Sequence, residues 1–361
     1  PVRPERAPRL AALATLARQH GIESISPSAI GSEEGPLKRV LAFRLDEAAP
    51  HVRAELPQWL YDLIEAQYED ANLLYPAMME GAPLGLRVNL RKTTRESVLE
   101  TLKADGVEAY PTPYSPDGIR LPTKPGLTRW PIYKDGLVDV QDEGSQLIAR
   151  LLGARRREMI CDFCAGAGGK TLAIGALMRS TGSLYAFDVN EKRLAGMAPR
   201  MRRAGLTNVH PAAIRSEQDP RVKRLRGKFD RVLIDAPCTG TGTLRRNPDL
   251  KWRLSPEELD RINAIQKSVL ENASKLVKSG GRLVYATCSL LRRENQDVVE
   301  AFLAANPEWR LLPAKDVFEE QRIRFPASQW ERFGAYMQLL PHVNNTDGFF
   351  AAVLERTGEK R

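Results

Sequence analysis

The chain has 361 residues, of which 42% are hydrophobic and 27% charged, a balance that argues against a disordered chain. A net charge of +9 favours a polyanionic partner such as nucleic acid, and no apolar run approaches the roughly 20 residues that span a bilayer. Four cysteines are too few for a disulfide framework, so we expect a reducing, cytoplasmic setting. Because residue 1 is proline, we expect a trimmed or truncated chain.

The pattern along the chain predicts three parts: a helical segment over 1–55, a small α+β module over 56–140 and an α/β domain over 141–361. Apolar residues recur at helical spacing from Leu60 to Leu74. Leu84, Leu86, Val88 and Leu90 alternate as the residues of one strand face would. The cations near this strand make RNA binding by the module plausible.

From Leu147 onward, strand-like and helix-like runs alternate, which predicts a doubly wound, mostly parallel sheet with helices on both faces. The expected strands are 159–163, 183–188, 209–213, 229–235 and 282–287. The expected helices are 170–179, 191–204 and 256–277.

A glycine-rich loop, Cys164 to Gly169, follows the first of these strands and precedes a helix. Glycines let the backbone approach a nucleotide-like ligand, and Asp188, at the end of the next strand, could accept hydrogen bonds from a ribose. A P-loop would need glycine at Cys164, and the dinucleotide fingerprint would need glycine at Thr171. A bare glycine turn without a ligand remains an alternative.

Two cysteines follow strand-like runs, Cys238 in Asp-Ala-Pro-Cys and Cys288 in Thr-Cys-Ser. The carboxyl ends of parallel strands open onto one crevice, so both thiols should meet Asp235 and the glycine loop there. Two buried structural thiols are the competing interpretation. Cys161 and Cys164 form a C-x-x-C, but without a second such pair we expect no metal site.

Asp235 to Trp252 and Tyr285 to Ser289 resemble the Sun/Fmu (RsmB-like) family of RNA cytosine-5 methyltransferases. The resemblance extends to Asp142–Gln146 and to Asp347–Phe350. It implies a Rossmann-like methyltransferase sheet, S-adenosylmethionine as cofactor and a cytosine in RNA as target, with ribosomal RNA preferred and transfer RNA the alternative. We expect a monomer.

On the same resemblance, Cys288 is expected to be the nucleophile, Cys238 the thiol that helps to release the product, and Asp235 the acid at the cytosine edge. Lys170 is expected in the active site as well. The expected cofactor contacts are Cys164, Ala165, Gly166, Ala167, Gly168, Gly169, Lys170, Asp188, Arg193 and Asp235.

The chain departs from the family where Ile214 and Arg215 replace an acid expected near the adenine, and the role of Asp219 nearby stays open. This keeps a non-catalytic RNA-binding assembly factor as an alternative. Arginine-rich runs could follow RNA phosphates. They are Arg155–Arg157, Arg200–Arg203, Arg221–Lys228 and Arg245–Arg246.

Overall fold

The computed structural model describes residues 7–123, 126 and 130–358. The chain divides into two compact units, Pro1–Tyr61 and Asp62–Arg361. The first unit is helical and packs a small apolar core from α1, α2 and α3. Its helices are α1 (Ala7–His20), α2 (Pro27–Ile30), α3 (Glu34–Ala42) and α4 (Pro50–Arg53).

The helical spacing predicted from Leu60 to Leu74 corresponds to two helices, α5 (Gln58–Glu65) and α6 (Ala71–Met79), rather than one. The small α+β module follows as an antiparallel sheet in the order β2-β3-β1-β4. Its elements are β1 (Leu84–Val88), α7 (Arg95–Ala104), β2 (Tyr110–Pro111), β3 (Gly118–Leu121), α8 (Pro131–Lys134) and β4 (Val138–Val140).

The core of this module forms because alternate residues of β1 face α7. Leu84, Leu86 and Val88 are buried with Val98 and Leu102 of the helix. The Oγ1 of Thr94 caps α7 by accepting a hydrogen bond from the backbone N of Ser97 at 3.2 Å. Leu90, expected on the same face, lies beyond the end of β1 and is 45% exposed.

The large sheet has the order β10-β12-β9-β8-β5-β6-β7, with β11 paired to β12. The first five of its strands in the chain are parallel, and the last three are antiparallel to their neighbours. Its strands are β5 (Met159–Asp162), β6 (Ser183–Asp188), β7 (Val209–Ala213), β8 (Phe229–Asp235), β9 (Val277–Thr287), β10 (Trp309–Leu312), β11 (Met337–Leu339) and β12 (Phe349–Arg356).

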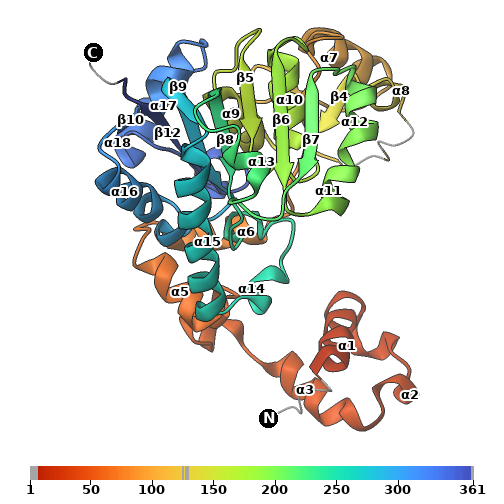
Figure 1. Ribbon diagram of the computed structural model, residues 1–361. Coiled ribbons are helices and arrows are strands. Elements are labelled where there is room, and N and C mark those ends of the chain that lie inside the picture. The colour runs from red at the N-terminus through yellow and green to blue at the C-terminus, as the bar shows by residue number, and fades with distance from the viewer. Residues whose placement is uncertain (1–6, 124–125, 127–129, 359–361) are drawn as a thin grey trace. The chain divides into compact units, whose positions relative to one another are not determined.

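Helices cover both faces of this sheet, each over its own buried apolar cluster, so the predicted doubly wound fold is confirmed (Figure 1). One cluster takes in residues of α9, α10, α12 and α17, and the other takes in residues of α13, α15 and α16. The helices are α9 (Glu143–Leu151), α10 (Gly169–Leu177), α11 (Glu191–Ala195), α12 (Met197–Ala204), α13 (Pro220–Lys223), α14 (Leu250–Arg253), α15 (Pro256–Ser274), α16 (Gln296–Ala305), α17 (Ala314–Glu319), α18 (Ala327–Phe333) and α19 (Pro341–Asn344).

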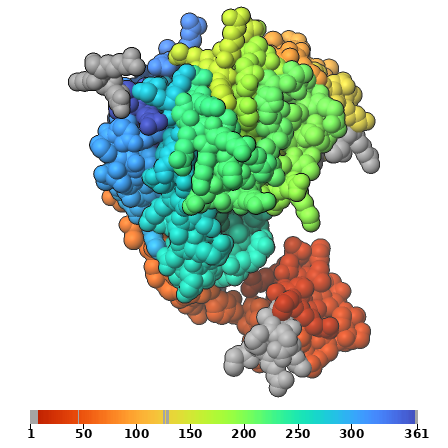
Figure 2. Space-filling model, in the orientation of Figure 1, coloured from red at the N-terminus to blue at the C-terminus, as the bar shows by residue number. Residues whose placement is uncertain are grey.

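The helix expected over 191–204 is interrupted at Gly196, which separates α11 from α12. The helix expected to reach residue 277 ends at Ser274, and β9 begins at Val277, five residues before the expected start. Figure 2 shows the second unit as one continuous body, from the yellow-green surface over β5 to the blue surface over α16. Among the described residues, no helix is both long and apolar enough to cross a membrane.

Candidate active site

The two cysteines singled out in the sequence lie side by side. Cys238 follows β8 and Cys288 follows β9, and these neighbouring parallel strands pair in register, with Asp235 opposite Ala286. The two Sγ atoms are 3.4 Å apart, and both thiols are partly exposed. The backbone N of Gly242 donates to the carbonyl of Cys288 at 2.9 Å, which ties the loop after Cys238 to the end of β9.

A partly buried ion pair joins the helix after the glycine loop to the same edge. Lys170 is the second residue of α10, and its Nζ lies 2.6 Å from Oδ2 of Asp235. Burial opposes the charge on the lysine, but the carboxylate of Asp235 outweighs it and raises the pKa of Lys170. Lys170 is therefore held as a cation beside the acid that ends β8.

The glycine loop has the shape of a cradle. Gly166 and Gly168 have φ of +55° and +85°, a left-handed conformation that other residues rarely adopt. A Cβ on Gly168 would lie 2.6 Å from Cγ of Met197, and one on Gly166 would lie 2.5 Å from the guanidinium of Arg193. Only glycine fits both positions without a shift of these neighbours.

Asp188 shapes this loop from the end of β6. Its Oδ2 accepts a hydrogen bond from the backbone N of Gly166 at 2.7 Å, and its Oδ1 accepts one from Asn190 at 2.7 Å. Each carboxylate oxygen has two lone pairs, so Asp188 can still accept a further donor. Its side chain is 94% buried, since only 6% of its surface is exposed.

A polar cleft of about 290 Å³ lies between the glycine loop and the segment that follows β4. Seven residues of the predicted site line it: Cys164, Ala165, Ala167, Gly169, Lys170, Arg193 and Asp235. Of the predicted cofactor contacts, Gly166, Gly168 and Asp188 do not line this cleft. The other six lining residues were not among the predicted site residues, although Asp142 and Ser145 lie in the segment that carries the family resemblance; the six are Val140, Gln141, Asp142, Ser145, Asp162 and Arg200.

Asp162 is the least expected group in the cleft. It ends β5 and is only 1% exposed; Oδ2 accepts from Thr171 Oγ1 at 2.6 Å, whereas Oδ1 is buried without a hydrogen-bond partner. Burial raises the pKa of Asp162 to about 7, and the negative charges of Asp235 and Asp188 add to this effect. Its place at a strand end, directly before Phe163 and the glycine loop, was the signal that could have found it.

Several arginines that were expected to meet phosphates instead make internal contacts. Arg246 pairs with Asp347 at 2.5 Å and with Asp142 at 3.0 Å, and Arg245 donates to the carbonyl of Thr346 at 2.9 Å. Arg200 and Arg203 both pair with Asp139. Two acids already balance the charge of Arg246, and the contact of Arg245 and Arg246 with RNA phosphates stays a prediction.

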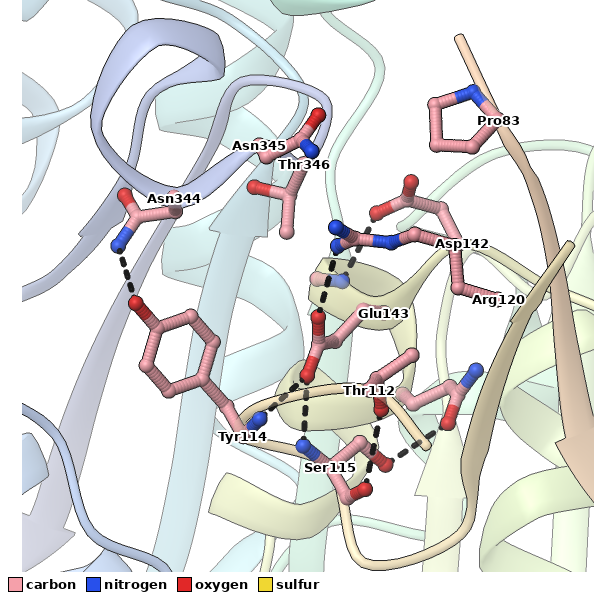
Figure 3. Close-up of polar contacts among 12 residues, drawn as sticks. Pro83, Thr112, Tyr114, Ser115, Arg120, Asp142, Glu143, Asn344, Asn345 and Thr346 are labelled. Carbon is pink, nitrogen blue, oxygen red and sulfur yellow. Dashed lines mark hydrogen bonds and ion pairs between the residues drawn. The ribbon is translucent and has the colours of Figure 1, made fainter. Parts of the chain in front are cut away.

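The junction between the small module and the large sheet is polar as well (Figure 3). Glu143, 3% exposed, accepts hydrogen bonds from the backbone N atoms of Tyr114 and Ser115 at 2.6 and 2.8 Å. Arg120 pairs with the other oxygen of Glu143 at 3.3 Å. This buried glutamate fixes the module against α9.

Asp219 has a structural place. Its side chain caps α13 by accepting from the backbone N of Arg221 at 2.9 Å, and it also accepts from Arg215 at 3.0 Å. Ile214 is 4% exposed and belongs to the apolar cluster on one face of the sheet. Among the described residues, no three His, Cys, Asp or Glu side chains are grouped so as to hold a metal ion.

Residues 149–355 match the family described as 16S rRNA methyltransferase RsmB/F. The chain belongs to this family. Residues 56–127 match the ferredoxin-like domain of RsmF/B-like methyltransferases, a range that overlaps the small module but ends before β4. The predicted family resemblance is confirmed, while the boundaries at residues 55 and 140 stay a prediction.

Curated relatives carry the name ribosomal RNA small subunit methyltransferase B. The chain is 37% identical over 83% of its length to that of Proteus mirabilis, and 34% identical over 76% to a probable one of Bacillus subtilis. It spans only 65% and 60% of these two relatives.

Solved structures show the same fold. A methyltransferase homolog protein from Pyrococcus horikoshii is 29% identical, with a TM-score of 0.72 over 86% of this chain and 100% of that one. NSun6 from Pyrococcus horikoshii with SFG is 21% identical, with a TM-score of 0.73 over 84% of this chain and 99% of that one. The latter likeness bears on the fold alone.

Proposed function

We propose that this chain transfers a methyl group from S-adenosylmethionine to carbon 5 of a cytosine in RNA through a covalent cysteine adduct. The observation that carries the proposal is the pair of thiols 3.4 Å apart beside the Lys170–Asp235 ion pair. A protein that only binds RNA needs neither thiol. The names of the curated relatives favour ribosomal RNA as substrate, with transfer RNA as the alternative.

The residues of the polar cleft fit S-adenosylmethionine. The glycine loop brings backbone to the wall of the cleft, and Asp188, which accepts from Gly166 N, can accept a further hydrogen bond from a ribose hydroxyl. The amino-acid end of the cofactor carries a positive ammonium group and a negative carboxylate. The cleft offers the cations Lys170 and Arg193 to the carboxylate and the unpartnered oxygen of Asp162 to the ammonium group. When bound, the cofactor supplies a methyl group on a sulfonium.

Carbon 5 of cytosine is a poor nucleophile, so the reaction needs an activating step. The Cys288 thiolate would add to carbon 6, which gives carbon 5 the electron density to attack a methyl group. In this proposal Asp235 contacts the base edge, and a proton that ring nitrogen 3 takes through Asp235 is replaced from the ammonium of Lys170, 2.6 Å away. Transfer of the carbon 5 proton to solvent water then restores the ring double bond and breaks the carbon–sulfur bond, and the electron pair of that bond returns to Cys288.

A denaturing gel with labelled RNA tests these roles. Cys288→Ala cannot form the adduct and should lose activity while it keeps its fold. Cys238→Ala should still attack and methylate but release slowly, so that a protein–RNA band accumulates. A band from Cys288→Ala alone would reverse the two roles, and no band from either variant would support two structural thiols.

The same geometry allows a test against the non-catalytic alternative. Calorimetry of S-adenosylmethionine with the unmodified chain should show one-site binding, whereas an assembly factor with a degenerate cofactor site would show none. Bisulfite sequencing of RNA from cells that lack and then regain the protein would identify the target cytosine and separate ribosomal from transfer RNA.

A further inference from the structure

We infer that Glu294 is a positioning residue that holds Cys238 and Cys288 at their working separation; this rests on the proposed function. Glu294 ends the short 3₁₀ turn Arg292–Glu294 and is fully buried, with 0% of its surface exposed. A buried carboxylate is costly unless hydrogen bonds compensate it, so its partners define what it does.

The Glu294 carboxylate accepts from four donor groups on three residues. Oε1 accepts from the backbone N of Thr239 at 2.8 Å and from Nε2 of Gln266 at 3.0 Å. Oε2 accepts from Oγ1 of Thr239 at 2.5 Å and from the hydroxyl of Ser289. Such a set suits the ionised, acceptor-only form of the side chain.

These partners are the neighbours of the two thiols. Thr239 follows Cys238 directly, and Ser289 follows Cys288 directly. Gln266 of α15 also donates to the carbonyl of Pro237 at 2.9 Å, so the residues on both sides of Cys238 are held. One carboxylate therefore joins two chain segments that are 50 residues apart and sets how closely their sulfur atoms approach.

The charge of Glu294 has a second consequence for Cys238. The pKa of Cys238 is raised well above its usual value, first by its hydrogen bond with Cys288, then by burial, and also by the negative charge of Glu294. A protonated Cys238 can donate its S–H to the sulfur of Cys288 as the carbon 6 bond breaks and the electron pair returns there. No atom is transferred in this contact, which stabilises the leaving thiolate.

Glu294→Gln separates charge from shape. The amide oxygen can still accept from Thr239 N and Gln266, and the amide NH₂ meets two hydroxyls that can turn to accept. In a Cys288→Ala background, alkylation of the Cys238 peptide by iodoacetamide is followed against pH by mass spectrometry. The pH midpoint of Cys238 alkylation should fall by roughly 0.5–1 pH unit when Glu294→Gln removes the negative charge.

Two matched variants complete the test. Glu143→Gln removes another buried carboxylate that accepts two backbone N–H groups, but it touches neither thiol loop, so the Cys238 midpoint should not move. Thr239→Val removes a hydroxyl contact and keeps the charge. It should lower kcat and leave the alkylation midpoint unchanged.

With Cys288 present, Glu294→Gln should lower kcat about tenfold and leave KM for RNA and for S-adenosylmethionine within about twofold, because the neutral amide holds the two thiol loops by weaker hydrogen bonds while the binding surfaces remain. An unchanged midpoint with unchanged kcat overturns the inference, and so does an equal midpoint shift in Glu143→Gln. The alkylation needs neither RNA nor cofactor, so failure of methyl transfer by the unmodified chain would refute the proposed function separately.

Discussion

Replacing Asp162 with asparagine should stabilise the protein at neutral pH and weaken its binding of the cofactor. Asp162 is 1% exposed, and burial raises its pKa from 3.8 to about 7. A difference of about three pKa units corresponds to about 4 kcal/mol at about 1.4 kcal/mol for each. Asparagine has no charge to bury, and its amide oxygen can still accept from Thr171.

The sign of the pH dependence follows from the raised pKa. The folded protein takes up a proton at Asp162 as the pH falls through about 7, whereas the unfolded chain does so only near 3.8. The cost of the buried charge is therefore fully present above pH 7, shrinks as the pH falls and is gone below 3.8. The free energy of unfolding of Asp162→Asn should exceed that of the unmodified chain by about 4 kcal/mol at pH 8 and by about 1.5 kcal/mol at pH 5.

Urea unfolding of both proteins at pH 5 and pH 8, followed by circular dichroism, measures this difference. Asp105→Asn, at an exposed position beyond α7, serves as the control and should change little at either pH. The reasoning would be refuted if Asp162→Asn is less stable than the unmodified chain at pH 8. It would also be refuted if the difference in unfolding free energy between the two proteins is the same at pH 5 and pH 8. Titration with S-adenosylmethionine should show weaker binding to Asp162→Asn. The ammonium group of the cofactor would contact Oδ1 of an ionised Asp162, and asparagine has no negative charge to offer it.

Two further substitutions probe the cofactor cradle and the frame around it. Asp188→Ala should weaken S-adenosylmethionine binding by about 1–3 kcal/mol, because Gly166 N loses its partner; unchanged affinity by calorimetry would count against the ribose placement. Arg246→Met leaves Asp347 buried without its cation and should cost about 3–5 kcal/mol at pH 8 in urea unfolding. The loss should be smaller at pH 5, because burial already raises the pKa of Asp347 to about 6. The slope of log RNA affinity against log salt should not change in Arg246→Met; a slope reduced by about one would show a phosphate contact.

The central part of the fold could be predicted because its signals are local. Parallel strands buried on both faces read as short apolar runs, and β5, β6, β7 and β8 lie where those runs do. The strand β12 carries a similar apolar run, Phe349 to Leu354, which the sequence analysis did not assign to a strand. Its insertion between β9 and β10 depends on contacts far along the chain.

In the candidate site too, some residues could be placed from the sequence and others could not. The rule that parallel strands end at one edge brings Cys238, Cys288 and Asp235 together without any knowledge of side chains. Partners of charged groups could not be foreseen, because they come from distant segments. Arg246 pairs with Asp142, 104 residues earlier, and nothing near Glu294 in the sequence indicates that it accepts from Thr239 and Ser289.

The net charge of +9 therefore cannot be interpreted as a footprint of RNA at the thiols. Arg155–Arg157 and Arg226–Lys228 precede β5 and β8, so they lie at the amino ends of parallel strands, whereas both thiols follow the carboxyl ends. Arg200, Arg203 and Arg246 are paired with acids that hold the frame of the site. Arg215, which lies outside these runs, is exposed and follows the carboxyl end of β7, so it lies at the same edge of the sheet as the thiols and is better placed than Arg155–Arg157 or Arg226–Lys228 to meet RNA there.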